Sequence, residues 1–231
     1  MKRFLSLMLA IFILISASAV YAAEPDKAQL EELKELGILT GDPDGSLRLG
    51  DTITRAETVK MIIAAQNMVK YSDTALEMVK SSFPDVWETH WAKLYINLAK
   101  NMKIVEGDEN GNFNPESEVT NEEVVKMLVC LLGYGAMAES TGGYPAGYIS
   151  TASRIGITEG MTLELNTFAT RGDVAVMFAN SLDIPLMVQT VWNATTGDEE
   201  YQILDGRNGV RKATIKSEYF GIKEEETGET E

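Results

Sequence analysis

The chain has 231 residues, 45% of them hydrophobic, a formal net charge of −15 at pH 7 and a single cysteine. So acidic a chain is unsuited to a broad electrostatic grip on nucleic acid or on an anionic membrane surface, and any anionic ligand must be held by a few placed donors. One cysteine excludes an intramolecular disulfide framework, and Cys130, inside the apolar run 127–132, is expected to be a small buried hydrophobe.

The N-terminal segment has the pattern of a secretory signal peptide. Lys2 and Arg3 precede an apolar run over residues 4–15, and small residues up to Ala22 follow. We expect residues 1–22 to be removed, which lowers the formal charge from −15 to −17. A retained N-terminal anchor is the alternative. No later segment approaches the roughly 20 apolar residues of a membrane-spanning helix.

An internal repeat organises the rest of the chain. Three short motifs each lead into an apolar helix: Thr-Arg-Ala-Glu at 54–57, Thr-Asn-Glu-Glu at 120–123 and Thr-Arg-Gly-Asp at 170–173. When the threonines are aligned, three further sets of residues coincide: Met61, Met127 and Met177; Ile62, Leu128 and Phe178; Gly41, Gly107 and Gly160. The repeats are predicted over residues 24–70, 81–135 and 142–186, and the first lacks the aromatic lead-in present in the others.

Each repeat reads as helix, loop, helix. Apolar residues recur at helical spacing in the first halves, at Leu30, Leu33 and Leu36, at Trp91, Leu94, Tyr95 and Leu98, and at Ile149, Ala152 and Ile155. Turn-rich connectors follow at 41–47 and 107–113, where Gly, Asn and Asp are expected to supply positive φ angles.

The second helix of each repeat is predicted to start with a capping box. The threonine accepts from the backbone of the third helical residue, whose acidic side chain reaches back to the threonine N–H. The pairs are Thr54 with Glu57, Thr120 with Glu123, and Thr170 with Asp173.

Two arginines do not follow from capping. Arg55 and Arg171 stand at the first helical position, where a positive charge meets the positive end of the helix dipole at a cost of about 0.3–1 kcal/mol. One explanation is that free backbone donors and the guanidinium together bind a carboxylate or phosphate. The other is an ion pair with a nearby acid such as Asp51 or Asp173.

The segment after the third repeat changes character. Residues 187–192 and 201–204 read as short strands, and a turn leads to a third short segment at 213–215. Together they predict a small β appendage over 187–222, followed by an acidic, disordered tail at 223–231.

Several motifs together resemble S-layer homology domains. They are Phe83-Pro84-Asp85-Val86, His90-Trp91-Ala92, the connector 107–115 and the three capping motifs, and the resemblance spans about residues 25–186. It implies a mainly α fold, with three helix-loop-helix repeats in a pseudo-threefold bundle and ligand grooves between neighbours. It also implies a location at the bacterial cell wall, and the non-covalent anchoring of a secreted protein there by binding an anionic, pyruvylated secondary cell-wall polysaccharide.

The resemblance also suggests site residues. In that family the motif arginine contributes to the ligand site, and this role carries over to Arg55 and Arg171, whereas Asn121 replaces the arginine in the second repeat. For Trp91 and Tyr144, a place in the core or groove wall is favoured over a free platform for sugar stacking. Asp85 is expected to cap the turn leading to Trp91 or, as second choice, to support the groove.

Enzymatic chemistry is not expected. No convincing Ser/His/Asp set or zinc ligand cluster is present, and the connectors lack the glutamate that an EF-hand loop needs at its twelfth position, where Ile53 and Val119 stand. We therefore expect no catalytic residues, cofactor or metal. The alternative function is a module for protein interaction or S-layer assembly, which binds other surface proteins and has degenerate grooves.

Overall fold

The computed structural model describes residues 25–68, 79–193, 195–197 and 199–223. The predicted signal peptide and nearly all of the predicted acidic tail lie outside these residues. Within them the chain is mainly helical, with one two-stranded sheet. The helices are α1 (Lys27–Glu35), α2 (Arg55–Ala65), α3 (Lys93–Asn101), α4 (Asn121–Leu131), α5 (Gly135–Ser140), α6 (Ala146–Ile155), α7 (Arg171–Ser181) and α8 (Ile215–Tyr219), and the strands are β1 (Met187–Trp192) and β2 (Glu199–Ile203).

The second helices of the repeats, α2, α4 and α7, all start with a complete capping box. The threonine side chain accepts from the backbone N–H three residues later, and the acidic side chain there accepts from the threonine N–H at 3.0 Å in each copy. The three threonines adopt nearly the same extended conformation, with φ of −84°. This local signal fixes where each of the three helices begins.

The residues just before these helices close the three repeats into a ring. The N–H of Ile53 donates to Ala169 O at 3.2 Å, that of Ala169 to Val119 O at 2.9 Å, and that of Val119 to Ile53 O at 3.0 Å. All three side chains are fully buried. Each repeat therefore bonds to both others around a common pseudo-threefold axis.

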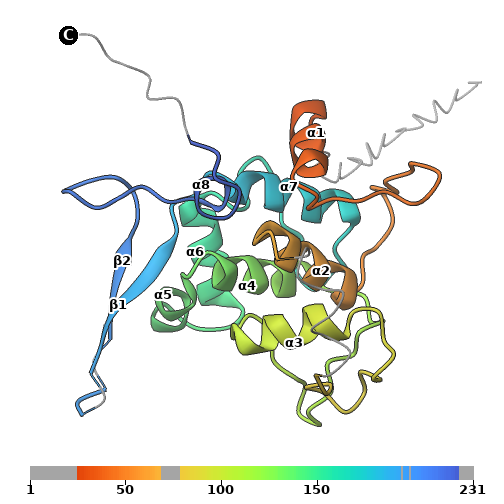
Figure 1. Ribbon diagram of the computed structural model, residues 1–231, viewed down its shortest axis with the longest axis horizontal. Helices are drawn as coiled ribbons and strands as arrows, with labels where there is room; N and C mark the ends of the chain where they lie inside the picture. Colours follow the sequence, from red (N-terminus) through yellow and green to blue (C-terminus); the bar gives the residue numbers. More distant parts are fainter. Residues whose placement is uncertain (1–24, 69–78, 194, 198, 224–231) are drawn as a thin grey trace, which may run out of the picture.

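Helix packing is exchanged between repeats. The second helix of each repeat packs on the first helix of the next, α2 on α3, α4 on α6 and α7 on α1 (Figure 1). As a result, the two helices of one repeat do not form a core by themselves, and the three repeats depend on one another for a core.

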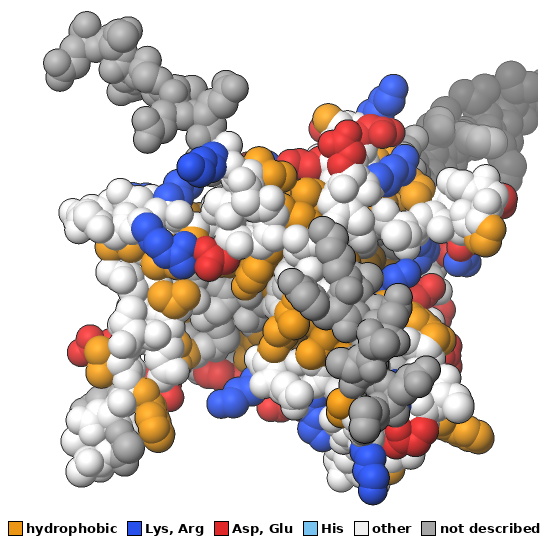
Figure 2. Space-filling model, in the orientation of Figure 1, with side chains coloured by type: hydrophobic (Ala, Val, Ile, Leu, Met, Phe, Trp, Pro, Cys, Tyr) orange, Lys and Arg blue, Asp and Glu red, His pale blue; other side chains and the backbone are white. Residues whose placement is uncertain are grey.

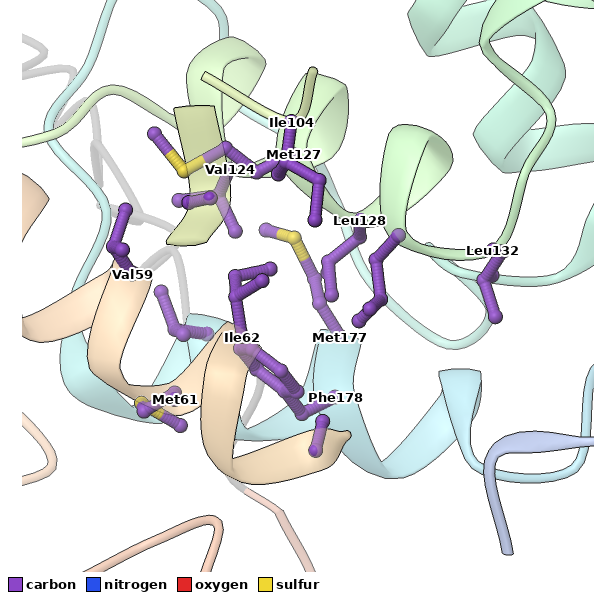
Figure 3. Packing of buried hydrophobic residues seen from close by; sticks show 14 of the residues in the cluster. Val59, Met61, Ile62, Ile104, Val124, Met127, Leu128, Leu132, Met177 and Phe178 are labelled. Atoms are coloured by element: carbon purple, nitrogen blue, oxygen red, sulfur yellow. The ribbon is translucent and has the colours of Figure 1, made fainter. Parts of the chain in front are cut away.

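One shared core lies between α2, α4 and α7. Ile62, Leu128 and Phe178 occupy one position of the repeat and are each fully buried, and Figure 3 shows them with Val124 and Met177 packed between the three helices. A single core of this size suits a domain that is too small for three separate ones. In the described part of the chain, no helix is both long and apolar enough to cross a membrane.

The apolar stripe predicted on the first helix of the second repeat is only partly buried. Trp91 is 51% exposed, and Tyr95 and Leu98 are partly buried and pack against the core. The buried residues of α3 and its cap are Ala92, Lys93, Ile96, Asn97 and Ala99. The additional short helix α5 was not predicted and precedes the third repeat's first helix.

The C-terminal appendage is partly β, as predicted. Strands β1 and β2 pair antiparallel, with Val188 opposite Gln202, and the hairpin projects from the helical body (Figure 1). The third predicted segment is extended at Ala213, whose N–H donates to Leu204 O at 2.9 Å and whose carbonyl accepts from Leu186 N–H at 2.8 Å. A capping box between Thr214 and Ser217 then starts helix α8 at Ile215, which was not predicted.

Helix α8 ties the appendage to the bundle. Lys216 Nζ lies 2.7 Å from the carboxylate of Asp183 and 3.0 Å from that of Glu32 on α1, and Asn67 donates to the carbonyl of Tyr219. The appendage thus contacts both the first and the third repeat.

Candidate functional site

Both motif arginines bridge two repeats. Arg55 Nε donates to Phe113 O at 2.9 Å, and its Nη1 lies 2.8 Å from the carboxylate of Glu123 in the second repeat. Its guanidinium also sits 5.0 Å from the centre of the Phe113 ring. The arginine therefore joins the first repeat to the connector and capping acid of the second.

Arg171 repeats this arrangement between the third repeat and the first. Its Nε donates to Leu47 O at 2.9 Å and its Nη2 to Thr40 O at 3.2 Å, while Nη1 lies 3.6 Å from the carboxylate of Glu57. The predicted kind of partner, an acid, is present, but it is the capping acid of the neighbouring repeat rather than Asp51 or Asp173.

The backbone donors at these helix starts are occupied. The N–H of Arg55 donates to Ser117 O at 2.9 Å and that of Ala56 to Pro115 O at 3.0 Å, and Arg171 N–H donates to Asp51 O at 2.9 Å. The idea that free N–H groups at these helix starts would bind an anion is therefore wrong. The closure of the three repeats uses the donors that a single isolated helix would leave open.

A cavity of about 440 Å³ lies beside Arg55, and we call it the Tyr144 groove. Its lining includes Arg55, Glu106, Asp108, Glu118, Glu123, Lys126 and Tyr144. Lys126 Nζ lies 3.6 Å from the Glu106 carboxylate and 5.7 Å from the centre of the Tyr144 ring. Burial raises the pKa of the Tyr144 hydroxyl, so this side chain stays neutral at physiological pH.

A second cavity of about 180 Å³ lies beside Arg171, and we call it the Trp91 groove. Its lining includes Thr40, Gly41, Asp42, Glu57, Lys60, Trp91 and Arg171. Lys60 Nζ lies 3.3 Å from the Thr40 hydroxyl.

The two grooves are built from equivalent positions of the repeat. In each groove, one repeat supplies the arginine, and a second repeat supplies the connector, the capping acid and a lysine. The remaining repeat supplies the aromatic residue that precedes its first helix. Four of the predicted site residues thus come together in two pairs, Arg55 with Tyr144 and Arg171 with Trp91. Repetition of the same set at two places is unlike a chance surface hollow.

The lysines were missed by sequence reasoning. Lys60 and Lys126 both stand six residues after the capping threonine, on α2 and α4. The alignment of the repeats contained this signal, but a single lysine on an amphipathic helix is usually an ordinary solvated residue. Only the structure shows that each lines a groove together with an arginine from another repeat.

The aromatic side chains form groove walls with one open face. Trp91 is 51% and Tyr144 50% exposed, so neither belongs to the core. The His90 ring stacks against Trp91 with 5.8 Å between ring centres, and His90 Nε2 lies 2.9 Å from a carboxylate oxygen of Glu116. A half-exposed ring beside cations can receive the apolar face of a sugar.

Asp85 lies outside both groove linings and supports the Tyr144 groove from behind. Its carboxylate accepts from Phe113 N–H at 2.8 Å and from Asn114 N–H at 2.6 Å. It therefore fixes the connector whose Phe113 carbonyl receives Arg55. Of the two roles predicted for Asp85, this geometry fits the support of the groove and does not fit the capping of the turn before Trp91.

The repeat glycines act in different ways. A Cβ at Gly41 would lie 3.0 Å from Ser46 O, and one at Gly107 would lie 2.9 Å from the backbone carbon of Gly111, so both positions need glycine for close approach of the connector. Gly160 has a φ of +72° instead.

The third equivalent position carries no arginine. Asn121 is 6% exposed, and its side-chain Nδ2 donates at 3.0 Å to Glu164 O and to the hydroxyl of Thr167. The position of Lys60 and Lys126 is taken by Val176. The amide thus ties the second repeat to the third without presenting a charge.

Two negative findings concern chemistry. Among the residues described by the structure, no group of three or more His, Cys, Asp or Glu side chains could hold a metal ion. Cys130 packs against the core, and burial raises the pKa of its thiol, which leaves it a poor nucleophile.

Comparison with known proteins identifies relatives of this chain. The model of the S-layer homology domain matches residues 28–59 and 82–125. The chain is 30% identical to the middle cell wall protein of Brevibacillus brevis over 84% of its own length, and 31% identical to a cell surface protein of Thermoanaerobacter kivui over 71%. A surface layer protein of Brevibacillus choshinensis is 30% identical over 69%. The matched regions cover only 17%, 21% and 14% of these relatives, respectively.

Proposed function

Because the chain is an S-layer homology domain protein related to surface-layer and cell-surface proteins, we propose that it anchors itself at the cell wall by binding an anionic secondary wall polysaccharide in its two grooves. Its location is the cell surface. The role is binding and not catalysis, and the acidic groups of the polymer, such as pyruvate ketals, are the recognised feature.

The observation that carries this proposal is the recurrence of arginine, lysine and a half-exposed aromatic ring in both grooves. Cations provide charge-assisted hydrogen bonds to a carboxylate, and the ring provides a surface for a sugar. Local cations also explain how a chain with a net charge of −15 can hold an anionic polymer.

The exposed groove residues give the sharpest test. Both arginines hold repeats together, with side chains only 14% and 9% exposed, so their removal would confuse stability with binding. The variant to make is Trp91→Ala with Tyr144→Ala. Its matched control is Trp87→Ala, because Trp87 is 76% exposed and lies outside both groove linings.

The chain from residue 23 onward is sedimented with purified cell-wall sacculi and with sacculi stripped of their secondary polymer. We expect the wild type and the Trp87 variant to bind only the intact sacculi, and the double variant to lose most of this binding. Equal sedimentation with stripped sacculi, or no binding to either, would refute polymer anchoring.

The alternative, assembly with other surface proteins, has one observation in its favour. Strands β1 and β2 expose large hydrophobic side chains, with Trp192 at 66% and Val191 at 42%, and Figure 2 shows hydrophobic side chains along the hairpin. Concentration-dependent self-association of the purified chain without any polymer would favour this second function.

A further inference from the structure

The two grooves share their architecture but differ in charge. At the position of Glu106 in the Tyr144 groove, the Trp91 groove has Thr40. These residues are equivalent in the repeat, because each precedes its connector glycine, Gly107 or Gly41, by one position. Since both side chains neighbour the groove lysine, this single difference changes what the lysine can do.

In the Tyr144 groove the lysine already has an anion beside it. Lys126 Nζ is 3.6 Å from the Glu106 carboxylate. In the Trp91 groove the equivalent Lys60 Nζ donates to the neutral Thr40 hydroxyl, at 3.3 Å. A ligand carboxylate must therefore displace a fixed negative charge in one groove and only a hydroxyl in the other.

The connector acids differ in the same direction. Asp42 forms an ion pair with Arg48, with 2.7 Å between Nε and Oδ2. The equivalent Asp108 instead accepts from the neutral Asn114 amide at 3.0 Å, and Arg55 is the cation whose charge stabilises its ionised form. Hydrogen bonds, first among them that from Asn114, lower the pKa of Asp108, so it is ionised at neutral pH.

The motif arginines follow the pattern as well. Arg55 is held by Glu123 at 2.8 Å, whereas Arg171 lies 3.6 Å from Glu57, beyond hydrogen-bond distance. The Nη1 group of Arg171 is thus held less tightly by a carboxylate of the protein than the Nη1 group of Arg55.

Taken together, the Tyr144 groove faces its two cations with four carboxylates, Glu106, Asp108, Glu118 and Glu123, whereas the Trp91 groove has two, Asp42 and Glu57, the first of them paired with Arg48. Like charges placed around a ligand carboxylate oppose its binding, more strongly where water is partly excluded.

We propose that the two grooves divide the polymer between them: the Trp91 groove receives the acidic sugar residue, and the larger Tyr144 groove receives a neutral stretch. The cavity volumes fit this division, since 180 Å³ suits one terminal sugar and 440 Å³ a longer segment. Thr40 and Glu106 are the residues that set the difference. This inference rests on the polysaccharide-binding function proposed above.

The chain supplies a matched pair of substitutions to test it. Thr40→Glu gives the Trp91 groove the carboxylate of its counterpart, and Glu106→Thr does the reverse. Both residues are exposed, so neither change disturbs the core. The probes are the purified wall polymer and the same polymer with its carboxyl groups reduced to alcohols, and affinity is measured by calorimetry on the chain from residue 23 onward.

We expect Thr40→Glu to weaken binding of the native polymer about five- to tenfold, comparable with an ion pair formed at a partly shielded site. Binding of the carboxyl-reduced polymer should not change. Glu106→Thr should leave native-polymer affinity equal to or above that of the wild type. Lys60→Met should act like Thr40→Glu, and its counterpart Lys126→Met should weaken binding of the native polymer less than Lys60→Met does.

The outcomes separate the two proposals. If the wild type binds native polymer but Thr40→Glu and Lys60→Met have no effect, or Lys126→Met alone abolishes binding, the division between grooves is overturned and polymer binding stands. If the wild type binds neither form of the polymer, the proposed function fails, and the inference fails with it.

Discussion

Arg55 of the first repeat and Glu123 of the second form an ion pair of 2.8 Å between Nη1 and Oε1. The same carboxyl group accepts from the Thr120 N–H through its other oxygen, at 3.0 Å. One acid therefore caps its own helix and binds the neighbouring repeat, so that helix initiation and repeat assembly depend on a shared group.

A double-mutant cycle can measure this coupling. Arg55→Met and Glu123→Gln each remove one charge, and the glutamine keeps an oxygen for the cap. We expect a coupling of about 0.5–1 kcal/mol in the free energy of unfolding, since the Glu123 side chain is one-third exposed. The cycle of Arg171→Met with Glu57→Gln serves as comparison, and its 3.6 Å pair should couple less. Equal coupling in both cycles in urea denaturation would contradict the geometry.

Asp85 should be essential to the Tyr144 groove although it does not line it. Asp85→Asn leaves one of two backbone donors, those of Phe113 and Asn114, without its acceptor, which should cost about 1–3 kcal/mol of stability. The connector then loses its fixed position behind Arg55. Thermal unfolding gives the readout, and Asp44→Asn, in an exposed turn where Asp44 accepts only from Ser46 N–H, is the matched control. A loss of stability no larger than that of the control would show that the connector keeps its position without Asp85.

The repeat register made much of the fold predictable. The aligned threonines located the starts of α2, α4 and α7, because a capping box is a local device that needs only four residues. The helix that begins at Ile215 was not predicted, since a short apolar run does not distinguish a strand from the start of a helix.

The groove composition could not be derived in the same way. Helix packing is exchanged between repeats, so the partners of Arg171 come from a repeat more than 100 residues away, and sequence proximity suggested Asp173 instead of Glu57. The same exchange explains why the backbone donors at Arg55 are occupied. Partners that depend on how repeats close on each other are not encoded in any one repeat.

The chain should lose stability in alkali partly through one tyrosine. Burial raises the pKa of Tyr134 to about 12, and its hydroxyl donates to Pro185 O at 2.8 Å. Because the folded pKa lies above the unfolded value near 10, this contribution is fully present below pH 10 and is lost as the pH rises through 12. Tyr134→Phe should remove roughly 2–3 kcal/mol of the decline in unfolding free energy over this range.

Urea denaturation between pH 9 and pH 12 gives the measurement. Tyr95→Phe, on the half-buried surface of α3, is the control and should retain the wild-type slope. An unchanged slope in Tyr134→Phe would mean that the hydroxyl is not shielded from solvent.

The C-terminal segment should stabilise the repeats. Lys216 contacts Asp183 and Glu32 at once, at 2.7 and 3.0 Å, and its side chain is 18% exposed. Lys216→Met should therefore lower the free energy of unfolding by about 1–2 kcal/mol, because two carboxylates lose their shared cation. Lys27→Met, on the exposed surface of α1, should change it by less than about 0.5 kcal/mol. A melting temperature unaffected by Lys216→Met would show that the appendage only rests on the bundle.

The third inter-repeat position should contribute to stability but not to binding. Asn121 donates to Glu164 O and to the Thr167 hydroxyl from a site that is 6% exposed, so Asn121→Ala removes two side-chain hydrogen bonds between the second and third repeats. We expect a loss of about 1–3 kcal/mol in the free energy of unfolding. At a temperature where the variant is folded, its affinity for the wall polymer should stay within about twofold of the wild-type affinity. The reason is that neither Asn121 nor Val176 offers a charge to an anion. A tenfold loss of affinity, roughly, would instead place a third functional groove there, and the arginine would then be dispensable for binding.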